Sequence, residues 1–193
     1  MTIARTLRWW PLVGLSALVL LGLLVGRGST PLDDWFLDLR HEHRWLGSLL
    51  AFTDARLVVL TFVVAVAIAV YRRRWRLAAV TAVTPVAAVV AVRVLKRIFG
   101  REKGGALAYP SGHVTVTIVV LGLLVIVVGA TAWMVIVAVL WALLGLLGQA
   151  FTHHYFTDTV GAVFMATSLL RLAVGFAGLD RCQPGCDLDH SSG

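Results

Sequence analysis

Charged residues are scarce in this chain of 193 residues: Asp, Glu, Lys and Arg make up 14% of it, against roughly 25% in a soluble domain. Hydrophobic residues make up 59%, and the mean hydropathy is +0.88. No internal repeat, low-complexity segment or polar linker interrupts the sequence. These features exclude an ordinary soluble domain, and they predict one integral membrane domain over residues 1–193.

Apolar runs separated by short polar clusters supply the membrane-crossing segments. A helix needs about 20 residues to cross about 30 Å of hydrocarbon. The sequence predicts an all-α bundle of six transmembrane helices, at about residues 11–26, 57–71, 77–95, 114–129, 132–148 and 159–177. Several runs are short, so we expect tilted helices and arginine side chains that reach outward from the helix ends.

The N-terminal segment has the basic start and apolar middle of a signal peptide but no small-residue cleavage site, so we expect a retained first helix. An even number of spans places both termini on one side. Arg5, Arg8 and the basic run at 71–76 predict that this side is cytoplasmic, in a multi-pass protein of the cell membrane and most simply a bacterial inner membrane. The opposite loops are also basic, and their charge needs a second explanation.

Cysteine is almost absent. Cys182 and Cys186 lie in a short polar tail that this topology places in the reducing cytoplasm, where free thiols are expected. Together with His190 they offer too few ligands for a zinc site.

Acidic residues are also few, and they do not form a magnesium motif. Asp33, Asp34 and Asp38 lie in a separate external stretch, residues 30–46, which is predicted to form an amphipathic surface helix. His41 and His43 in the same stretch are expected to be solvated. We therefore predict no metal site and no cofactor.

The net charge of +7 raises the possibility of a nucleic-acid partner. The basic residues are scattered among membrane loops, however, and no stacking motif or recognition fold accompanies them. Nucleic acid is therefore excluded, and the lipid bilayer with its anionic head groups is the expected partner. The sequence does not specify an oligomeric state.

Ionisable residues at membrane depth are functional candidates, and one group of them follows the third predicted span. Three of its cations are spaced to share one helix face, and two more follow in a loop that ends in the flexible pair Gly104-Gly105; the five are Arg93, Lys96, Arg97, Arg101 and Lys103. This group predicts a binding site for an anion.

The segment Pro110-Ser111-Gly112-His113 comes directly before the fourth predicted span. A helix that begins after Ser111 offers unpaired N–H groups and a positive dipole end, which favour phosphate. Ser111 is placed to cap this helix, and Gly112 lets a ligand approach the backbone closely. We expect a phosphate cradle with His113 at its edge.

A second group, between the fifth and sixth predicted spans, contains His154 and Asp158 at spacing i, i+4. On a helical turn the carboxylate then accepts a hydrogen bond from one imidazole nitrogen and leaves the other with a free lone pair. Such a histidine is suited to act as a nucleophile or base. Each group alone is more often structural than functional, and their combination on one membrane face carries the functional hypothesis.

Together these residues resemble the signature of the type 2 phosphatidic acid phosphatase superfamily, membrane lipid phosphatases related to the vanadium haloperoxidases. The pattern K-x6-R-P, P-S-G-H and S-R-x5-H-x3-D corresponds to Lys96…Lys103, residues 110–113 and His154-x3-Asp158. The P-S-G-H block matches completely. Two positions depart from the pattern: Lys103-Gly104 stands where Arg-Pro is expected, and Leu147-Gly148 stands where Ser-Arg is expected.

The resemblance implies metal-independent hydrolysis of a lipid phosphate or pyrophosphate at the outer membrane face, with polyprenyl phosphates, phosphatidic acid and phosphatidylglycerol phosphate as suitable substrates. It implies that His154, oriented by Asp158, forms a phosphohistidine and that His113 protonates the leaving group. The implied phosphate ligands are Lys96, Arg101 or Lys103, and the N–H groups around Ser111 and Gly112. Arg93 or Arg97 is expected to replace the missing arginine. The alternatives are a degenerate lipid-phosphate binder without turnover and, less favoured, a transporter with a histidine relay.

Overall fold

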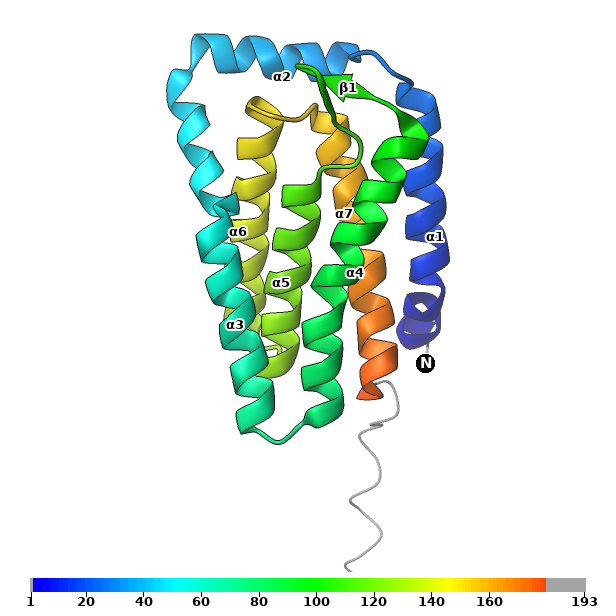
Figure 1. The fold of residues 1–193 in the computed structure, drawn as a ribbon, viewed down its shortest axis with the longest axis vertical. Helices are drawn as coiled ribbons and strands as arrows, with labels where there is room; N and C mark the ends of the chain where they lie inside the picture. The colour runs from blue at the N-terminus through cyan, green and yellow to red at the C-terminus, as the bar shows by residue number, and fades with distance from the viewer. Residues whose placement is uncertain (1, 180–193) are drawn as a thin grey trace, which may run out of the picture.

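The structure is a computed structural model that describes residues 2–179, with side chains from residue 8 onward. Cys182, Cys186 and His190 lie outside the described residues. Within them, helices account for nearly all of the chain (Figure 1). The long helices are α1 (Thr2–Val25), α3 (Ala55–Tyr71), α4 (Trp75–Phe99), α5 (Gly112–Val128), α6 (Ala132–Phe151) and α7 (Phe156–Ala177).

Each predicted span corresponds to one of these helices. The helices α1, α4, α6 and α7, and the continuous segment Arg44–Tyr71 that contains α3, are long and apolar enough to cross a membrane. Helix α5 is apolar but has 17 residues, which at the α-helical rise gives about 26 Å. An all-α membrane architecture therefore agrees with the structure, and α5 would cross only with a thinned bilayer or with neighbouring helices around it.

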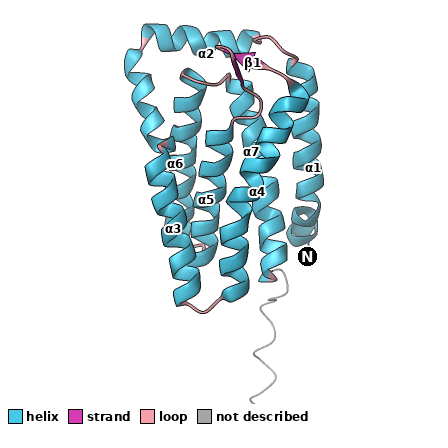
Figure 2. Cartoon of the chain, viewed as in Figure 1, coloured by secondary structure: helices cyan, strands magenta, loops and turns pink. Residues whose placement is uncertain are grey.

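One end of the bundle is covered by α2 (Pro31–Glu42), which lies across the long helices, and by a hairpin of β1 (Glu102–Lys103) and β2 (Ala106–Leu107) (Figures 1 and 2). We call this the capped end. The 3₁₀ helix η1 (Arg44–Thr53) descends from this end beside α6 and leads into α3. Exposed tryptophans mark both ends of the bundle, as in interfacial aromatic belts: Trp35 and Trp45 at the capped end, and Trp9, Trp10, Trp75 and Trp133 at the other.

Helix α5 lies at the centre of the bundle, in contact with α3, α4, α6 and α7. The core around it combines small and branched side chains; Ala88 of α4 and Ala166 of α7 are fully buried beside Val119 and Leu123. Small residues let helices approach closely where lipid offers no hydrophobic driving force between them. This packing fixes the N-terminal end of α5 beneath the capped end.

The hairpin was not expected, because Gly104-Gly105 was predicted to be flexible. Both glycines have positive φ, 59° and 79°, which is the requirement for a two-residue type I′ turn. Glu102 pairs with Leu107, and Lys103 pairs with Ala106. The glycines therefore form a fixed turn that holds Lys103 in place.

The prediction of a surface helix at 30–46 is confirmed for α2. The prediction that this stretch is separate from the rest of the protein is wrong. Thr30 caps the helix in a capping box with Asp33. Asp33 and Phe36 are buried, and the Phe36 ring stacks on Phe156 with centroids 4.2 Å apart. The inward face of α2 thus packs directly onto the end of α6 and the start of α7.

Candidate active site

A cavity of about 930 Å³ opens beneath the capped end, between α3, α4, α5, the hairpin and the α6–α7 loop. Six residues that the sequence singles out line it: Arg93, Lys96, Lys103, Gly112, His113 and His154. The rest of its lining is largely apolar and includes Val58, Val59, Val89, Val92 and Val116. The cavity therefore joins a cationic, histidine-bearing part to a part lined by aliphatic side chains.

His154 is 6% exposed and lies in the turn between α6 and α7, where its N–H donates to the Gln149 carbonyl. Its Nδ1 is 3.7 Å from an Asp158 carboxylate oxygen and has no hydrogen-bond partner. The predicted pairing of these residues is present as proximity, at a distance longer than a hydrogen bond. Because Nδ1 faces Asp158, Nε2 is the nitrogen left for a ligand in the cavity.

The environment of His154 favours the neutral imidazole. Burial lowers the pKa of His154, and the positive charges of Lys96 and Lys103 act in the same direction, while Asp158 opposes them. The net direction is a pKa below the ordinary value of 6.5. A free lone pair on Nε2 at neutral pH is what a nucleophile requires.

Arg101 does not reach the cavity, in contrast to the expectation that it binds phosphate. Its side chain is fully buried and forms ion pairs of 2.7 Å with both Asp33 and Asp158. Its remaining N–H groups donate to the Gly28 carbonyl and to the Thr157 hydroxyl. All five guanidinium donors are thus engaged within the protein, and Arg101 acts as a tie between α2, the hairpin and α7.

Asp33 is the residue at this site that sequence reasoning missed. Its oxygens accept hydrogen bonds from Arg101, from the Thr30 N–H and from the N–H and hydroxyl of Thr157. Burial alone would raise the pKa of Asp33, but these hydrogen bonds outweigh burial and lower it. A capping-box aspartate was visible in the sequence, whereas its ionic partner 68 residues away was not.

Two lysines, one from α4 and one from the hairpin, bring positive charge to the cavity. The Lys103 ammonium donates to the His154 carbonyl at 2.7 Å and lies 4.9 Å from the centre of the Tyr155 ring. The Lys96 ammonium donates to the Leu107 carbonyl at 2.6 Å. Each ammonium has further donors for a ligand. Burial lowers the pKa of Lys103, with the nearby Asp158 and Asp33 charges opposing it.

Helix α5 begins at Gly112, as the phosphate-cradle prediction requires. Ser111 occupies the N-cap position, but its hydroxyl makes no capping hydrogen bond, is fully buried and does not line the cavity. The Ser111 N–H donates to the Asp158 carbonyl, which links the α5 N-terminus to the start of α7. Gly112 and the exposed side chain of His113 line the cavity, so the first turn of α5 faces the same space as His154.

The missing arginine has a physical explanation. A Cβ atom at Gly148 would lie 2.5 Å from the Leu49 carbonyl carbon, because η1 packs against this part of α6. The next residue, Gln149, is buried and donates to the Thr53 hydroxyl, which lines the cavity. Of the two proposed replacements, Arg93 lines the cavity and Arg97 does not.

Within residues 2–179, no group of three or more His, Cys, Asp or Glu side chains is placed to hold a metal ion. Thr117, whose buried hydroxyl has no partner, is a further polar residue of the cavity wall that the sequence did not single out. Comparison with protein families, with curated proteins and with solved structures finds no match to this chain.

Proposed function

We propose that this protein is a membrane-embedded phosphatase that hydrolyses a lipid phosphate or pyrophosphate without a metal, through a phosphohistidine. One observation carries the proposal: His113, His154 and three cations line a single cavity together with several valines. Phosphoryl transfer depends above all on positioning and on neutralising charge, which fixed cations can supply. The resemblance of the three sequence blocks to the lipid phosphatase superfamily supports the same reaction class.

The placement of charge supports an active site at the outer face. The described part of the end opposite the cap carries Arg8, Arg72, Arg73, Arg74 and Arg76 and no acidic residue. Because the capped end carries more Lys and Arg residues, the positive-inside rule assigns the opposite end to the cytoplasm only once the cations of the capped end are attributed to substrate binding. With α5 crossing as the sixth span, the cavity opens at the outer surface, and the cations of the capped end serve the substrate.

In the proposed reaction, Nε2 of His154 attacks phosphorus, an N–P bond forms and the bond from phosphorus to the lipid oxygen breaks. His113 gives its proton to the departing oxygen. Water, activated by the neutral His113, then attacks phosphorus, the N–P bond breaks and inorganic phosphate leaves. Lys96, Lys103, Arg93 and the N–H groups of the first turn of α5 neutralise the phosphoryl oxygens.

The substrate class follows from the two parts of the cavity. The phosphate lies among the cations, and the hydrocarbon chain lies along Val58, Val89 and Val116 toward the lipid phase. Phosphatidic acid, phosphatidylglycerol phosphate and polyprenyl phosphates or pyrophosphates all have this form. Soluble phosphate esters lack the apolar part and are expected to be poor substrates.

Phosphate release from these lipids by the detergent-purified chain in EDTA tests the proposal. His154→Ala and His113→Ala are expected to abolish release, whereas His43→Ala, at an exposed position outside the cavity, is expected to retain it. Radiolabelled phosphate trapped on the rapidly denatured wild-type protein, and absent from His154→Ala, identifies the nucleophile. Equal release by wild type and His154→Ala would refute the phosphohistidine mechanism.

One observation keeps the degenerate binder as a second candidate: η1 leaves no space for a side chain at position 148, where the family pattern has its arginine. A binder retains the cavity and its cations but releases no phosphate. Lipid-phosphate binding by a wild-type protein that shows no release from any of the lipids would select this alternative.

A further inference from the structure

A second cavity, of about 820 Å³, lies at the capped end. Its lining comes from α2, η1 and the α6–α7 loop, and we call it the basic pocket; the lining residues are Leu37, Arg40, His41, Arg44, Leu50, Phe151, Thr152 and His153. Thr152 and His153 also line the candidate active-site cavity, so the two spaces adjoin across this loop.

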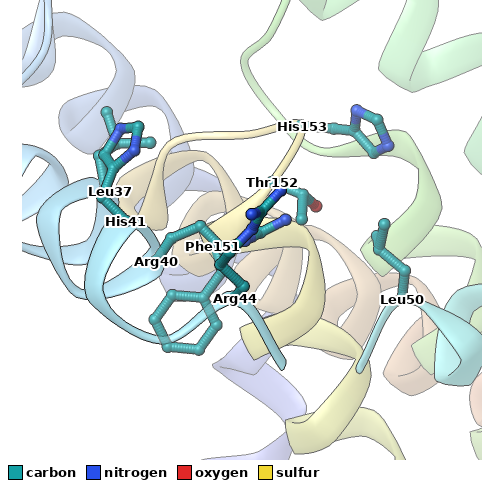
Figure 3. A pocket seen from close by; sticks show the side chains of 8 residues that line it. All are labelled: Leu37, Arg40, His41, Arg44, Leu50, Phe151, Thr152 and His153. Atoms are coloured by element: carbon teal, nitrogen blue, oxygen red, sulfur yellow. The ribbon is translucent and has the colours of Figure 1, made fainter. Parts of the chain in front are cut away.

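Every ionisable side chain in the lining of the basic pocket is basic. Figure 3 shows nitrogen atoms of the arginine side chains beside Thr152, with His41 on one side and His153 on the other. Within the described residues, neither Arg40 nor Arg44 forms an ion pair or a side-chain hydrogen bond. Their guanidinium donors are therefore available, in contrast to those of the buried Arg101.

The surroundings of this pocket are those of a membrane interface. Trp35 and Trp45 are 56% and 66% exposed. Trp35 lies in α2 with Arg40, and Trp45 follows Arg44 in η1. Tryptophan is enriched where hydrocarbon meets the head groups. The pocket itself also has apolar walls, formed by Leu37, Leu50 and Phe151. An anion that carries an apolar chain fits this lining better than a free ion does.

We propose that the basic pocket binds the phosphate of an anionic membrane lipid, at an accessory site distinct from the proposed site of hydrolysis. The two guanidinium groups provide the paired donors that suit phosphate oxygens, and His41 and His153 border them. The lipid chains extend over Leu37 toward the tryptophans. This proposal rests on the membrane placement given above and is independent of hydrolysis.

Native mass spectrometry of the detergent-purified full chain tests the site directly. We use His154→Ala protein throughout, so that no lipid is consumed, and titrate it with phosphatidylglycerol or with zwitterionic phosphatidylcholine. Arg40→Gln/Arg44→Gln is expected to weaken binding of one phosphatidylglycerol by roughly tenfold or more, since two charge-assisted interactions are lost. If binding is weakened by Lys96→Gln/Lys103→Gln and not by Arg40→Gln/Arg44→Gln, the lipid is held in the active-site cavity and the proposal is wrong.

The matched control is Arg27→Gln/Arg56→Gln, which removes the same charge from two exposed residues at the capped end that line neither pocket. This variant is expected to bind phosphatidylglycerol as the parent does. Equal affinity in the pocket and control variants would overturn the proposal. Binding of inorganic phosphate at Arg40 and Arg44 without binding of phosphatidylglycerol would also overturn it, because the source would then be the free ion.

Discussion

Replacing Asp33 by Asn tests the buried ionic cluster that joins the cap to the candidate active site. The substitution keeps the shape of the side chain but removes its charge and turns one acceptor oxygen into a donor. Asp33 accepts from Arg101, Thr30 and Thr157, and both it and Arg101 are fully buried. At least one of these donors would then face another donor with no water to replace the lost bond.

The expected cost follows from the geometry. Removing one partner of a buried ion pair typically destabilises a protein by about 3–5 kcal/mol. Arg101 keeps its 2.7 Å contact with Asp158, so we expect the lower limit, about 3 kcal/mol. For a chain of this size, that corresponds to a fall in Tm of roughly 6–12 °C.

Asp34→Asn provides the control, because Asp34 occupies the same first turn of α2 but is exposed. Both substitutions remove the same favourable interaction with the helix dipole, and an exposed change costs within about 0.5 kcal/mol. Tm is measured at pH 7 in one detergent, by tryptophan fluorescence. Asp33→Asn and Asp34→Asn proteins that melt within about 2 °C of each other would refute the cluster as a stabilising element.

The same comparison has a defined pH dependence. The pKa of Asp33 is lowered in the folded protein from its ordinary value of 3.8. The stabilisation from its charge is therefore complete above 3.8 and is lost as the pH falls through the lower folded-state value. The difference in Tm between wild type and Asp33→Asn should persist at pH 5 and shrink in stronger acid.

Two further predictions concern the cavity and its missing arginine. Lys96→Gln removes a charge that lowers the pKa of His154. The pKa of His154 should therefore rise, the imidazole should stay protonated to higher pH, and the acid limb of kcat/KM for phosphate release should move to higher pH. Arg56→Gln should leave the limb in place. An unmoved limb in Lys96→Gln would contradict the assignment of His154. Gly148→Ala should destabilise the protein by about 1–3 kcal/mol, because its Cβ would meet the Leu49 backbone. Gly28→Ala, which has open space around it, should not. Equal melting temperatures of the two variants would show that η1 can shift to make room for the Cβ.

The helices of the bundle were predictable because each is a local feature of the sequence. An apolar run such as 132–148 specifies a buried or lipid-facing helix without reference to any other segment, and α6 begins at Ala132 as expected. The end of α6 lies at Phe151, beyond the predicted end at residue 148, because the helix continues through Gly148 and Gln149 where η1 packs against it. The ten residues of η1 are mostly apolar but too few to cross a membrane, and the predicted elements include only residues 44–46 of them.

The candidate site divides in the same way. His113, His154 and the lysines were found because their local spacing carries chemical meaning, and the cavity contains them all. Arg101 was placed among the phosphate ligands because it is a cation in the same loop. Its actual partners, Asp33 and Asp158, are 68 and 57 residues away in the chain, and no periodicity reports contacts over such a separation.

The absence of a side chain at Gly148 and the presence of η1 are two aspects of one packing arrangement. The Leu49 carbonyl and the Leu50 N–H occupy the space that a side chain at 148 would need. The same segment places Thr53 at the cavity, where its hydroxyl accepts from Gln149. An arginine restored at 148 would therefore have to displace backbone, and not merely fill a vacant position. In the proposed phosphatase, a cation for the third phosphate oxygen would therefore come from another element, and Arg93 of α4 is the arginine of the described residues that lines the cavity.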